Sequence, residues 1–172
     1  MADEEILDIV DENDAVLFQA SRAEAHKKGL LHRCVLAQLI NSRGEWVLVT
    51  QASDRQDAGQ LVVPVGGHVR AGEESGDALM RETLEEIGFD IFEKKFIGKT
   101  IFRRTVLGRD ENHLFHFYEI YSDIQPRITE ETAGFEVFAK GQLKKEIQQN
   151  PGKFGDAFYF TAKTFYPDLL LP

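Results

Sequence analysis

Three glutamates between Gly66 and Phe89 have the spacing of a metal-binding helix face. Glu82, Glu85 and Glu86 are related as i, i+3 and i+4, so they share one side of a helix that turns about 100° per residue. Like charges at this spacing destabilise an isolated helix. A hard divalent cation such as Mg²⁺ offsets that repulsion, because it prefers carboxylate and water oxygens as ligands. By itself this spacing fits a solvated helix face as well as a divalent-cation site.

The residues just before these glutamates favour the divalent-cation site. The Gly66-Gly67 pair allows a tight backbone turn and leaves main-chain carbonyls uncovered, so the Gly67 oxygen is a candidate ligand. Arg81 is expected to hold Glu73 or Glu85 by a charge-assisted hydrogen bond. The segment thus supplies ligands and a residue that orients them.

A helix is predicted over residues 75–87, ended by Gly88. The face expected to pack on a sheet carries Leu79, Met80, Thr83, Leu84 and Ile87. Ala78 is expected on the acidic face, one turn before Glu82, where its small side chain leaves space. Glu74 and Asp77 are expected to be favoured by the helix dipole.

The segment 67–89 resembles the Nudix box of the Nudix hydrolases. Its charged, glycine and closing apolar positions match the family pattern in spacing: Gly67, Glu73, Arg81, Glu82, Glu85, Glu86, Gly88 and Phe89. The one departure is Thr83, where the pattern has an aliphatic residue, and Thr83 lies on the predicted packing face. The resemblance implies the family's α/β/α sandwich, an α/β (α+β) fold with a mixed β-sheet between helices.

The same resemblance implies hydrolysis of a nucleoside diphosphate linked to another moiety, or of a related diphosphate. Metal-bound water would attack phosphorus. The family pattern assigns one to three Mg²⁺ or Mn²⁺ ions to Glu82, Glu85 and Glu86, with the Gly67 carbonyl as a further ligand. Arg81 and Glu73 would be orienting partners.

One carboxylate must act as the general base, and the sequence leaves several candidates. Glu85 and Glu86 come first. Glu131 is the alternative, because many family members place a catalytic glutamate in a late loop, and the adjacent Glu130 could replace it. Both late glutamates could equally be ordinary loop charges.

A second resemblance, to isopentenyl-diphosphate isomerases and related hydrolases, covers the N-terminal part of the chain. Those isomerases bind a metal through histidines and glutamates whose positions correspond here to His26, His32, His68, Glu111 and His113. Glu111 and His113 are two residues apart, so on a strand both would face the same way. The resemblance implies a second site for Zn²⁺ or Mn²⁺, although each histidine could instead make ordinary hydrogen bonds.

Isomerase chemistry itself is less favoured than hydrolysis. The isomerases use a cysteine just before the Gly-His pair, where this chain has Gly66, and a glutamate where it has His113. Cys34 lies on an earlier predicted strand and is expected to be a core residue. The isomerases also lose acids of the Nudix box that are present here. An isomerase and a non-catalytic Nudix-like nucleotide-binding module remain the alternatives.

The rest of the chain supplies strands and helices without strict alternation, which predicts a mixed sheet in a single domain over residues 1–172. A hairpin and a helix are expected over about residues 1–31. Later strands include one ending near residue 106 and one starting near residue 112, joined by a polar loop Gly108–Glu111. Substrate specificity is expected to lie in three segments: residues 53–60, residues 104–111 and the aromatic segment 154–166.

Composition limits the partners and the compartment. The net charge of −9 disfavours binding to nucleic acid polymers or anionic membranes, so the expected partner is a small-molecule diphosphate. One cysteine excludes an intramolecular disulfide, the first residues do not resemble a signal peptide, and no apolar run is long enough to span a bilayer. These features predict a cytoplasmic protein. Whether it forms a homodimer is left open.

Overall fold

The structure, a computed structural model, describes residues 4–172. Its elements follow one another as β1 (Ile6–Val10), β2 (Val16–Ser21), α1 (Arg22–Lys28), β3 (His32–Ile40), β4 (Trp46–Gln51), β5 (Leu61–Val62), β6 (Val65–His68), α2 (Ser75–Ile87), β7 (Glu93–Val106), β8 (Arg109–Tyr121), β9 (Thr132–Phe138), α3 (Lys140–Gln149) and α4 (Asp156–Phe165). Two 3-10 turns, Pro151–Lys153 and Pro167–Leu169, flank α4. Among these elements no helix is long and apolar enough to cross a membrane.

Strand β3 organises the mixed sheet. It pairs in parallel with β8 from His32↔His113 to Ile40↔Tyr121, and antiparallel with β1, β4 and β6. The β7–β8 hairpin extends the sheet beyond β8, while β9 and β5 pair with β4. Because β3 borders both β6 and β8, residues from distant parts of the sequence meet around its first half.

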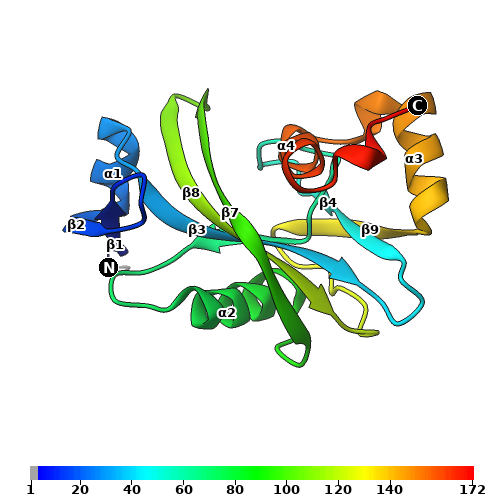
Figure 1. The fold of residues 1–172 in the computed structure, drawn as a ribbon, viewed down its shortest axis with the longest axis horizontal. Helices are drawn as coiled ribbons and strands as arrows, with labels where there is room; N and C mark the ends of the chain where they lie inside the picture. Colours follow the sequence, from blue (N-terminus) through cyan, green and yellow to red (C-terminus); the bar gives the residue numbers. More distant parts are fainter. Residues whose placement is uncertain (1–3) are drawn as a thin grey trace.

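Helices cover both faces of this sheet. In Figure 1, α2 lies below the sheet, and α3 and α4 lie above it. The arrangement confirms the predicted α/β/α sandwich with a mixed sheet between helices. Strands buried on both faces need apolar side chains at successive positions, which accounts for the continuous run of Val35, Leu36 and Ala37 in β3.

The two faces of the sheet have separate cores. Toward α2, Val35 and Ile120 pack with Leu79 and Ile87. Toward α4, Cys34, Leu36, Phe115 and Phe117 form another cluster, against which Phe160 and Phe165 pack. The alternation of side chains along β3 and β8 sends neighbouring residues to opposite cores. Cys34 is thus a buried residue, as predicted.

The N-terminal hairpin and helix lie where the sequence predicts them, apart from residues 1–3, which are outside the described part. Strands β1 and β2 pair antiparallel. The Ser21 hydroxyl accepts a hydrogen bond from the Glu24 backbone N–H at the start of α1, and Gly29 ends the helix at φ 62°. A serine cap and a left-handed glycine are the usual helix boundaries.

The predicted packing face of α2 is partly wrong. Leu79, Thr83 and Ile87 are buried, but Met80 and Leu84 are 41% and 50% exposed. Ala78 was expected on the acidic face, where its small side chain leaves space, and it is fully buried in the core. Helix α2 packs on β6, whose glycines allow a close approach. The buried face of α2 is therefore displaced from the predicted one toward the side that carries Ala78 and Glu82.

The predicted loop at residues 108–111 is also wrong. Strand β8 begins at Arg109, and the connection is a tight turn at Leu107 and Gly108, whose φ angles are 49° and 72°. Two consecutive left-handed residues match the twist of a hairpin, so two residues suffice for the connection. The polar residues of the expected loop instead pair across the strands, where the Thr105 hydroxyl donates to Asp110 at 2.7 Å.

Candidate active site and histidine cluster

A large cavity of about 530 Å³ lies on the α4 side of the sheet and reaches the Nudix-box residues Gly66, Gly67 and Glu86. All three segments predicted to govern specificity contribute to its wall. Arg55 comes from the loop after β4, Arg104 from the β7–β8 hairpin and Phe160 from α4. The fold thus brings the box and the variable segments around one space.

Glu82 is the buried acid of α2, and Glu86 is half-buried. The Gly66 N–H donates to Glu86 Oε2 at 2.8 Å, yet burial raises the pKa of Glu86 well above its usual range. Burial also raises the pKa of Glu82 to about 7, although the neighbouring Arg81 acts to lower it. The raised pKa values of Glu82 and Glu86 indicate that a positive charge bound beside these carboxylates would be favoured.

Arg81 links this helix to the residues before it. Its Nε and Nη2 donate to the two Glu73 oxygens at 3.0 and 2.9 Å, and Nη1 donates to Glu82 Oε1 at 2.5 Å. Nη2 also donates to the His68 carbonyl at 2.9 Å. Of the two predicted partners, Glu73 takes the direct hydrogen bonds, while Glu85 lies at 3.8 Å.

The remaining candidate acids lie at the edge of the site. The Glu85 side chain is 55% exposed. Glu131 borders the large cavity and pairs with Arg55 at 3.0 Å, while Glu130 is exposed. Within residues 4–172, the carboxylates of Glu82, Glu85 and Glu86 do not converge on one point, because Arg81 and the Gly66 N–H hold two of them.

The donor set fits a hard cation. It consists of carboxylate oxygens beside the glycine backbone of β6, which are the ligands that Mg²⁺ and Mn²⁺ prefer. Glu86 is half-buried, with the Gly66 N–H as a hydrogen-bond donor. A divalent ion bound there would compensate the burial of negative charge. Glu82, Glu86 and, after a rotamer change, Glu85 would hold it.

Gly67 is the position at which a side chain cannot be added. A Cβ built on it would lie 2.1 Å from the Glu82 carboxyl carbon. Contacts under about 3 Å do not persist, so either the carboxylate or the strand must move. The glycine is therefore required by the close approach of α2 to β6.

Replacing Gly67 by alanine is expected to lower the free energy of unfolding by about 1–3 kcal/mol and to reduce metal affinity. Arg81 holds the Glu82 carboxylate, so the clash cannot be relieved by a free rotamer change. Urea denaturation and metal titration check this result. The control is Gly141→Ala, because the space around Gly141 is open and the substitution should leave both measurements nearly unchanged; equal behaviour of the two variants would contradict the explanation.

The raised pKa of Glu82 predicts a pH dependence in metal-free buffer. Between pH 4.5 and about 7 the folded protein keeps a proton that the unfolded chain releases, so this group lowers the free energy of unfolding as pH rises. Glu82→Gln removes that contribution. The stability difference between the variant and the wild type should shift by roughly 2–3 kcal/mol across this window in favour of the variant. Urea unfolding in EDTA at several pH values measures it, and parallel stability profiles would refute it.

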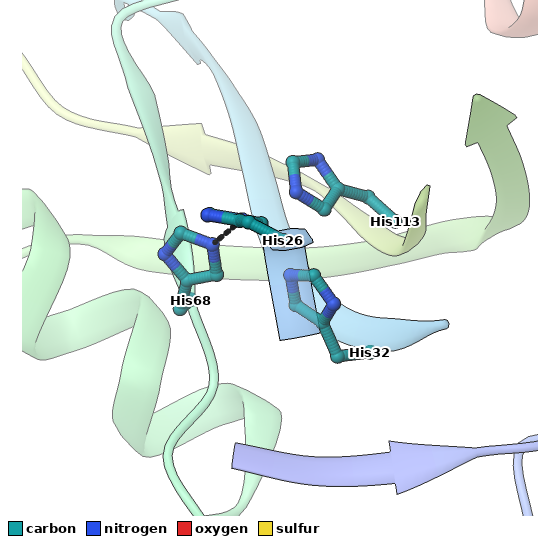
Figure 2. Close-up of side chains that lie close together, drawn as sticks. All are labelled: His26, His32, His68 and His113. Atoms are coloured by element: carbon teal, nitrogen blue, oxygen red, sulfur yellow. Dashed lines mark hydrogen bonds between the residues drawn. The ribbon is translucent and has the colours of Figure 1, made fainter. Parts of the chain in front are cut away.

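Four histidines form a separate group, the His cluster: His26 from α1, His32 from β3, His68 from β6 and His113 from β8 (Figure 2). One ring nitrogen from each lies within 4.8 Å of the others. The parallel register that pairs His32 with His113 brings two of them together. His26 Nε2 and His68 Nε2 are 3.2 Å apart.

The protonation of the His cluster suits a metal ion. His32 Nδ1 lies 2.7 Å from the Leu30 carbonyl and must carry the hydrogen, which leaves a lone pair on Nε2. Within residues 4–172, His32 Nε2 and His113 Nε2 are buried without a hydrogen-bond partner. Burial lowers the pKa of His32 to about 4 and that of His113 to about 2, so the rings are neutral. Neutral imidazoles are ligands for Zn²⁺.

Glu111, the fifth predicted member of the second site, lies outside this group. It shares the face of His113, as the two-residue spacing predicts, but its carboxylate accepts from Arg104 Nε at 2.9 Å and pairs with Arg109 at 3.6 Å. The arginines occupy the oxygens that a metal would use. The structure therefore brings together the four histidines and leaves Glu111 in an ion pair.

The arginines that line the large cavity could not be grouped from any sequence pattern. Arg22, Arg55, Arg104 and Arg109 come from four segments and line the same space, although the chain carries a net charge of −9. No two of them have a motif spacing, and only the tertiary fold brings them together. Acidic side chains line the same space, and Glu131 pairs with Arg55 while Glu111 pairs with Arg104 and Arg109.

A mixed sheet between helices, with a glutamate-bearing helix beside a glycine strand and a cavity, defines the Nudix class of proteins. The family model described as "NUDIX domain" matches residues 30–158. The chain belongs to the NUDIX family, and the resemblance stated from the box is confirmed.

Curated relatives carry two kinds of name. An uncharacterized Nudix hydrolase from Streptomyces coelicolor is 47% identical over 91 residues, 49% of this chain and 48% of that protein. An isopentenyl-diphosphate Delta-isomerase from Serratia proteamaculans is 31% identical over 154 residues, 88% of this chain and 86% of that protein. The chain spans about half the length of the Nudix hydrolase relatives from Streptomyces coelicolor and Nostoc. The relatives named hydrolases support the predicted enzyme class.

Solved structures with low identity share the fold. The crystal structure of the Deinococcus radiodurans protein DR0079 has a TM-score of 0.72 at 23% identity and covers 94% of this chain and 99% of that one. A MutT Nudix hydrolase from Burkholderia pseudomallei has a TM-score of 0.61 at 18% identity, covering 77% and 96%. At this identity the likeness concerns the fold alone.

Proposed function

We propose that the protein is a Mg²⁺- or Mn²⁺-dependent hydrolase of a diphosphate, most simply a nucleoside diphosphate linked to another moiety. The observation that carries the proposal is the placement of Glu86. Its half-buried carboxyl group borders the large cavity, accepts the Gly66 N–H and has a raised pKa. A carboxylate in such an environment suits a metal ligand or a general base.

The cavity wall supports an anionic substrate with an apolar or aromatic part. Arg55, Arg104 and Arg109 carry guanidinium groups, which bind phosphate oxygens in pairs. Each of them also pairs with Glu131 or Glu111, so a phosphate would share these arginines with a glutamate. Leu36, Phe102, Phe115 and Phe160 line the same space with apolar surface. A diphosphate whose second moiety packs on these rings fits both features, and each phosphate would lie near the box at Gly66 and Gly67.

The chain's own residues then have distinct tasks. Glu82, Glu85 and Glu86 hold the divalent ions, which when bound supply charge neutralisation and a more acidic water. Arg81 and Glu73 keep Glu82 in place. Glu86 is the first candidate for the base because its pKa is raised toward the working range, and Glu131 faces the cavity from the opposite loop, where Arg55 orients it.

We propose further that the His cluster is a second metal site, selective for Zn²⁺ over Mg²⁺. Four neutral nitrogen donors match a tetrahedral zinc shell, and Mg²⁺ prefers oxygen. The unpartnered nitrogens of His32 and His113 support the proposal.

An isomerase acting on an allylic diphosphate is the second candidate function. The relative from Serratia proteamaculans is named an isopentenyl-diphosphate Delta-isomerase, and the match covers 86% of its length. The His cluster is the structural feature that supports the comparison. The proton donor and acceptor of that chemistry, a cysteine and a glutamate, correspond here to Gly66 and His113. Cys34 borders the large cavity, but burial raises the pKa of its thiol, so hydrolysis remains the better proposal.

A substrate screen separates these proposals. Nucleotide sugars, ADP-ribose, dinucleotides, coenzyme A, nucleoside triphosphates and isopentenyl diphosphate would be incubated with Mg²⁺ or Mn²⁺ and followed by ³¹P and ¹H NMR. Cleavage of a diphosphate supports the hydrolase. Rearrangement of the alkene with the diphosphate retained supports the isomerase. Binding without either reaction supports a nucleotide-binding module.

Domain extent, compartment and assembly stay predictions. We propose a single domain in a reducing cytoplasm, since the one cysteine, Cys34, is buried and free. A small-molecule substrate remains the expected partner. Size-exclusion chromatography with light scattering tests for a homodimer.

A further inference from the structure

A serine, a histidine and an aspartate form a hydrogen-bonded line on the α2 side of the sheet, on the opposite face of β8 from His113. Ser75 Oγ lies 2.5 Å from His116 Nδ1. The other ring nitrogen, Nε2, lies 3.0 Å from Asp14 Oδ2. The three residues come from the start of α2, from β8 and from the turn between β1 and β2. None of them belongs to the His cluster. Ser75 lies within the Nudix-box segment but is not one of its matched positions, and Asp14 and His116 lie outside that segment.

The acceptor in this line fixes the tautomer of His116. An ionised carboxylate only accepts hydrogen bonds, so His116 Nε2 carries the hydrogen that points to Asp14. The neutral ring then has a lone pair on Nδ1, and the Ser75 hydroxyl donates to it. This is the arrangement in which a histidine can remove a proton from a serine while a carboxylate holds its other side.

Asp14 is held firmly for this role. Arg33 Nε donates to Asp14 Oδ1 at 2.5 Å, Arg33 Nη2 donates to its carbonyl at 2.7 Å, and Lys99 Nζ bonds to Oδ2. Burial opposes ionisation, yet the hydrogen bonds from Lys99 and Arg33 keep the pKa of Asp14 below its usual value. The residue also has a φ of 69°, in the left-handed region. Such a constrained aspartate fixes the ring orientation of His116.

The line is not sealed from solvent. It borders a second cavity of about 410 Å³, also lined by Gly76, Phe96 and Tyr118 and by the charged residues Arg33, Glu73, Glu74 and Lys99. Ser75 is half-buried and is the first residue of α2, a helix of 13 residues. The backbone N–H groups of Ser75 and Gly76 belong to the first turn, where helical donors lack an intrahelical acceptor. They are available to an oxygen that becomes negative near Ser75.

We propose that Ser75, His116 and Asp14 form a second, metal-independent catalytic site that hydrolyses small carboxylic esters through an acyl-serine intermediate. The cavity size admits a short acyl group, with Phe96 at its rim. The site uses none of the proposed metal ligands, and its cavity lies on the other face of the sheet from the large cavity.

The reaction balances without a co-reactant other than water. Ser75 Oγ forms a bond to the ester carbonyl carbon, and its proton moves to His116 Nδ1. The ester C–O bond then breaks, and the departing alcohol takes that proton. In the second half, water gives a proton to His116 and attacks the acyl carbon, which releases the carboxylic acid and restores the Ser75 hydroxyl. Asp14 stays ionised throughout and stabilises the charged ring.

The full-length protein in EDTA tests the proposal with p-nitrophenyl acetate and a fluorophosphonate probe. We expect nitrophenol release above the buffer rate and a probe adduct on the peptide containing Ser75. Ser75→Ala should lose both. His116→Gln should slow both by at least about tenfold, since general base catalysis contributes roughly 10²–10⁴-fold. Ser42→Ala, at a serine in an exposed turn, is the matched control and should behave as the wild type.

Two further readouts separate a catalytic role from a structural one. Ser75→Ala should keep the thermal transition of the wild type within a few degrees, and it should keep any metal-dependent diphosphate hydrolysis. Absence of an adduct on Ser75 in the wild-type protein would overturn the proposal, whatever the variants do. So would an adduct that forms at the wild-type rate in His116→Gln, because the histidine would then play no part in activating the serine.

Discussion

Glu86→Gln is expected to lower metal-dependent diphosphate hydrolysis by about 10²–10⁴-fold, the range attributed to a general base or its metal-bound equivalent. Glutamine keeps the size of the side chain but cannot be an anion. The Glu86 carboxylate both borders the large cavity and has a raised pKa. Steady-state kinetics on the best substrate from the screen measures the loss, with saturating Mg²⁺ or Mn²⁺ in both proteins.

The fold should survive this substitution. The glutamine amide oxygen can still accept the Gly66 N–H, which donates to Glu86 at 2.8 Å. Removing a buried ionisable group also removes the cost of its desolvation. In EDTA the variant should therefore unfold at the same temperature as the wild type or higher, so that loss of activity cannot be attributed to unfolding.

The matched control is Glu93→Gln at the exposed start of β7. It makes the same chemical change away from both cavities and should leave the rate within about twofold, as expected for a surface position. A Glu86→Gln variant with the kcat/KM of the wild type would contradict the proposed role of Glu86. A deficit equal in the two variants would show that the effect is not specific to the site.

Zn²⁺ should stabilise the metal-free protein through the His cluster. At a free concentration 100 times the Kd, binding to the folded state alone adds about 2.7 kcal/mol to the free energy of unfolding. For a chain of this size that corresponds to a rise of roughly 5–10 °C in Tm. Mg²⁺ should give no such rise through these nitrogens, because it prefers oxygen ligands. Calorimetry of zinc binding and thermal unfolding measure the two effects.

His32→Asn is designed to remove one ligand and little else. The asparagine N–H can replace His32 Nδ1 as the donor to the Leu30 carbonyl, while the Nε2 lone pair is lost. The zinc-dependent rise in Tm should fall to less than half. His116→Asn is the matched control, because His116 is the fifth histidine and lies outside the cluster. An undiminished zinc shift in His32→Asn, or none in the wild type, would contradict the second metal site.

Short-range patterns determined much of the fold and of the first site. The sequence predicted the helix over residues 75–87 and Glu73 or Glu85 as the partner of Arg81, and the structure contains the pair with Glu73. Such features are readable because helix periodicity relates residues within a few turns. The sequence did not predict which side of α2 packs on the sheet. Helix periodicity alone does not indicate that the glycine strand β6 leaves space for Ala78 and Glu82.

The His cluster stands between these two cases. His26, His32, His68 and His113 were named from the second resemblance, and the parallel pairing of β3 with β8 brings the last of them beside His32. Glu111 was named on the same ground, yet Arg104 takes its carboxylate. The sequence carries no mark of that ion pair, because the two residues meet only across the β7–β8 hairpin register.

By itself, the sequence determined the family, the layered α/β/α architecture and the acids of the box. Tertiary structure alone decided that Arg22, Arg55, Arg104 and Arg109 line one cavity and that Ser75, His116 and Asp14 form one hydrogen-bonded line. The physical reason is sequence separation: Asp14 and His116 are 102 residues apart. No local periodicity relates residues at that distance, and only the closure of the sheet around β3 brings them into contact.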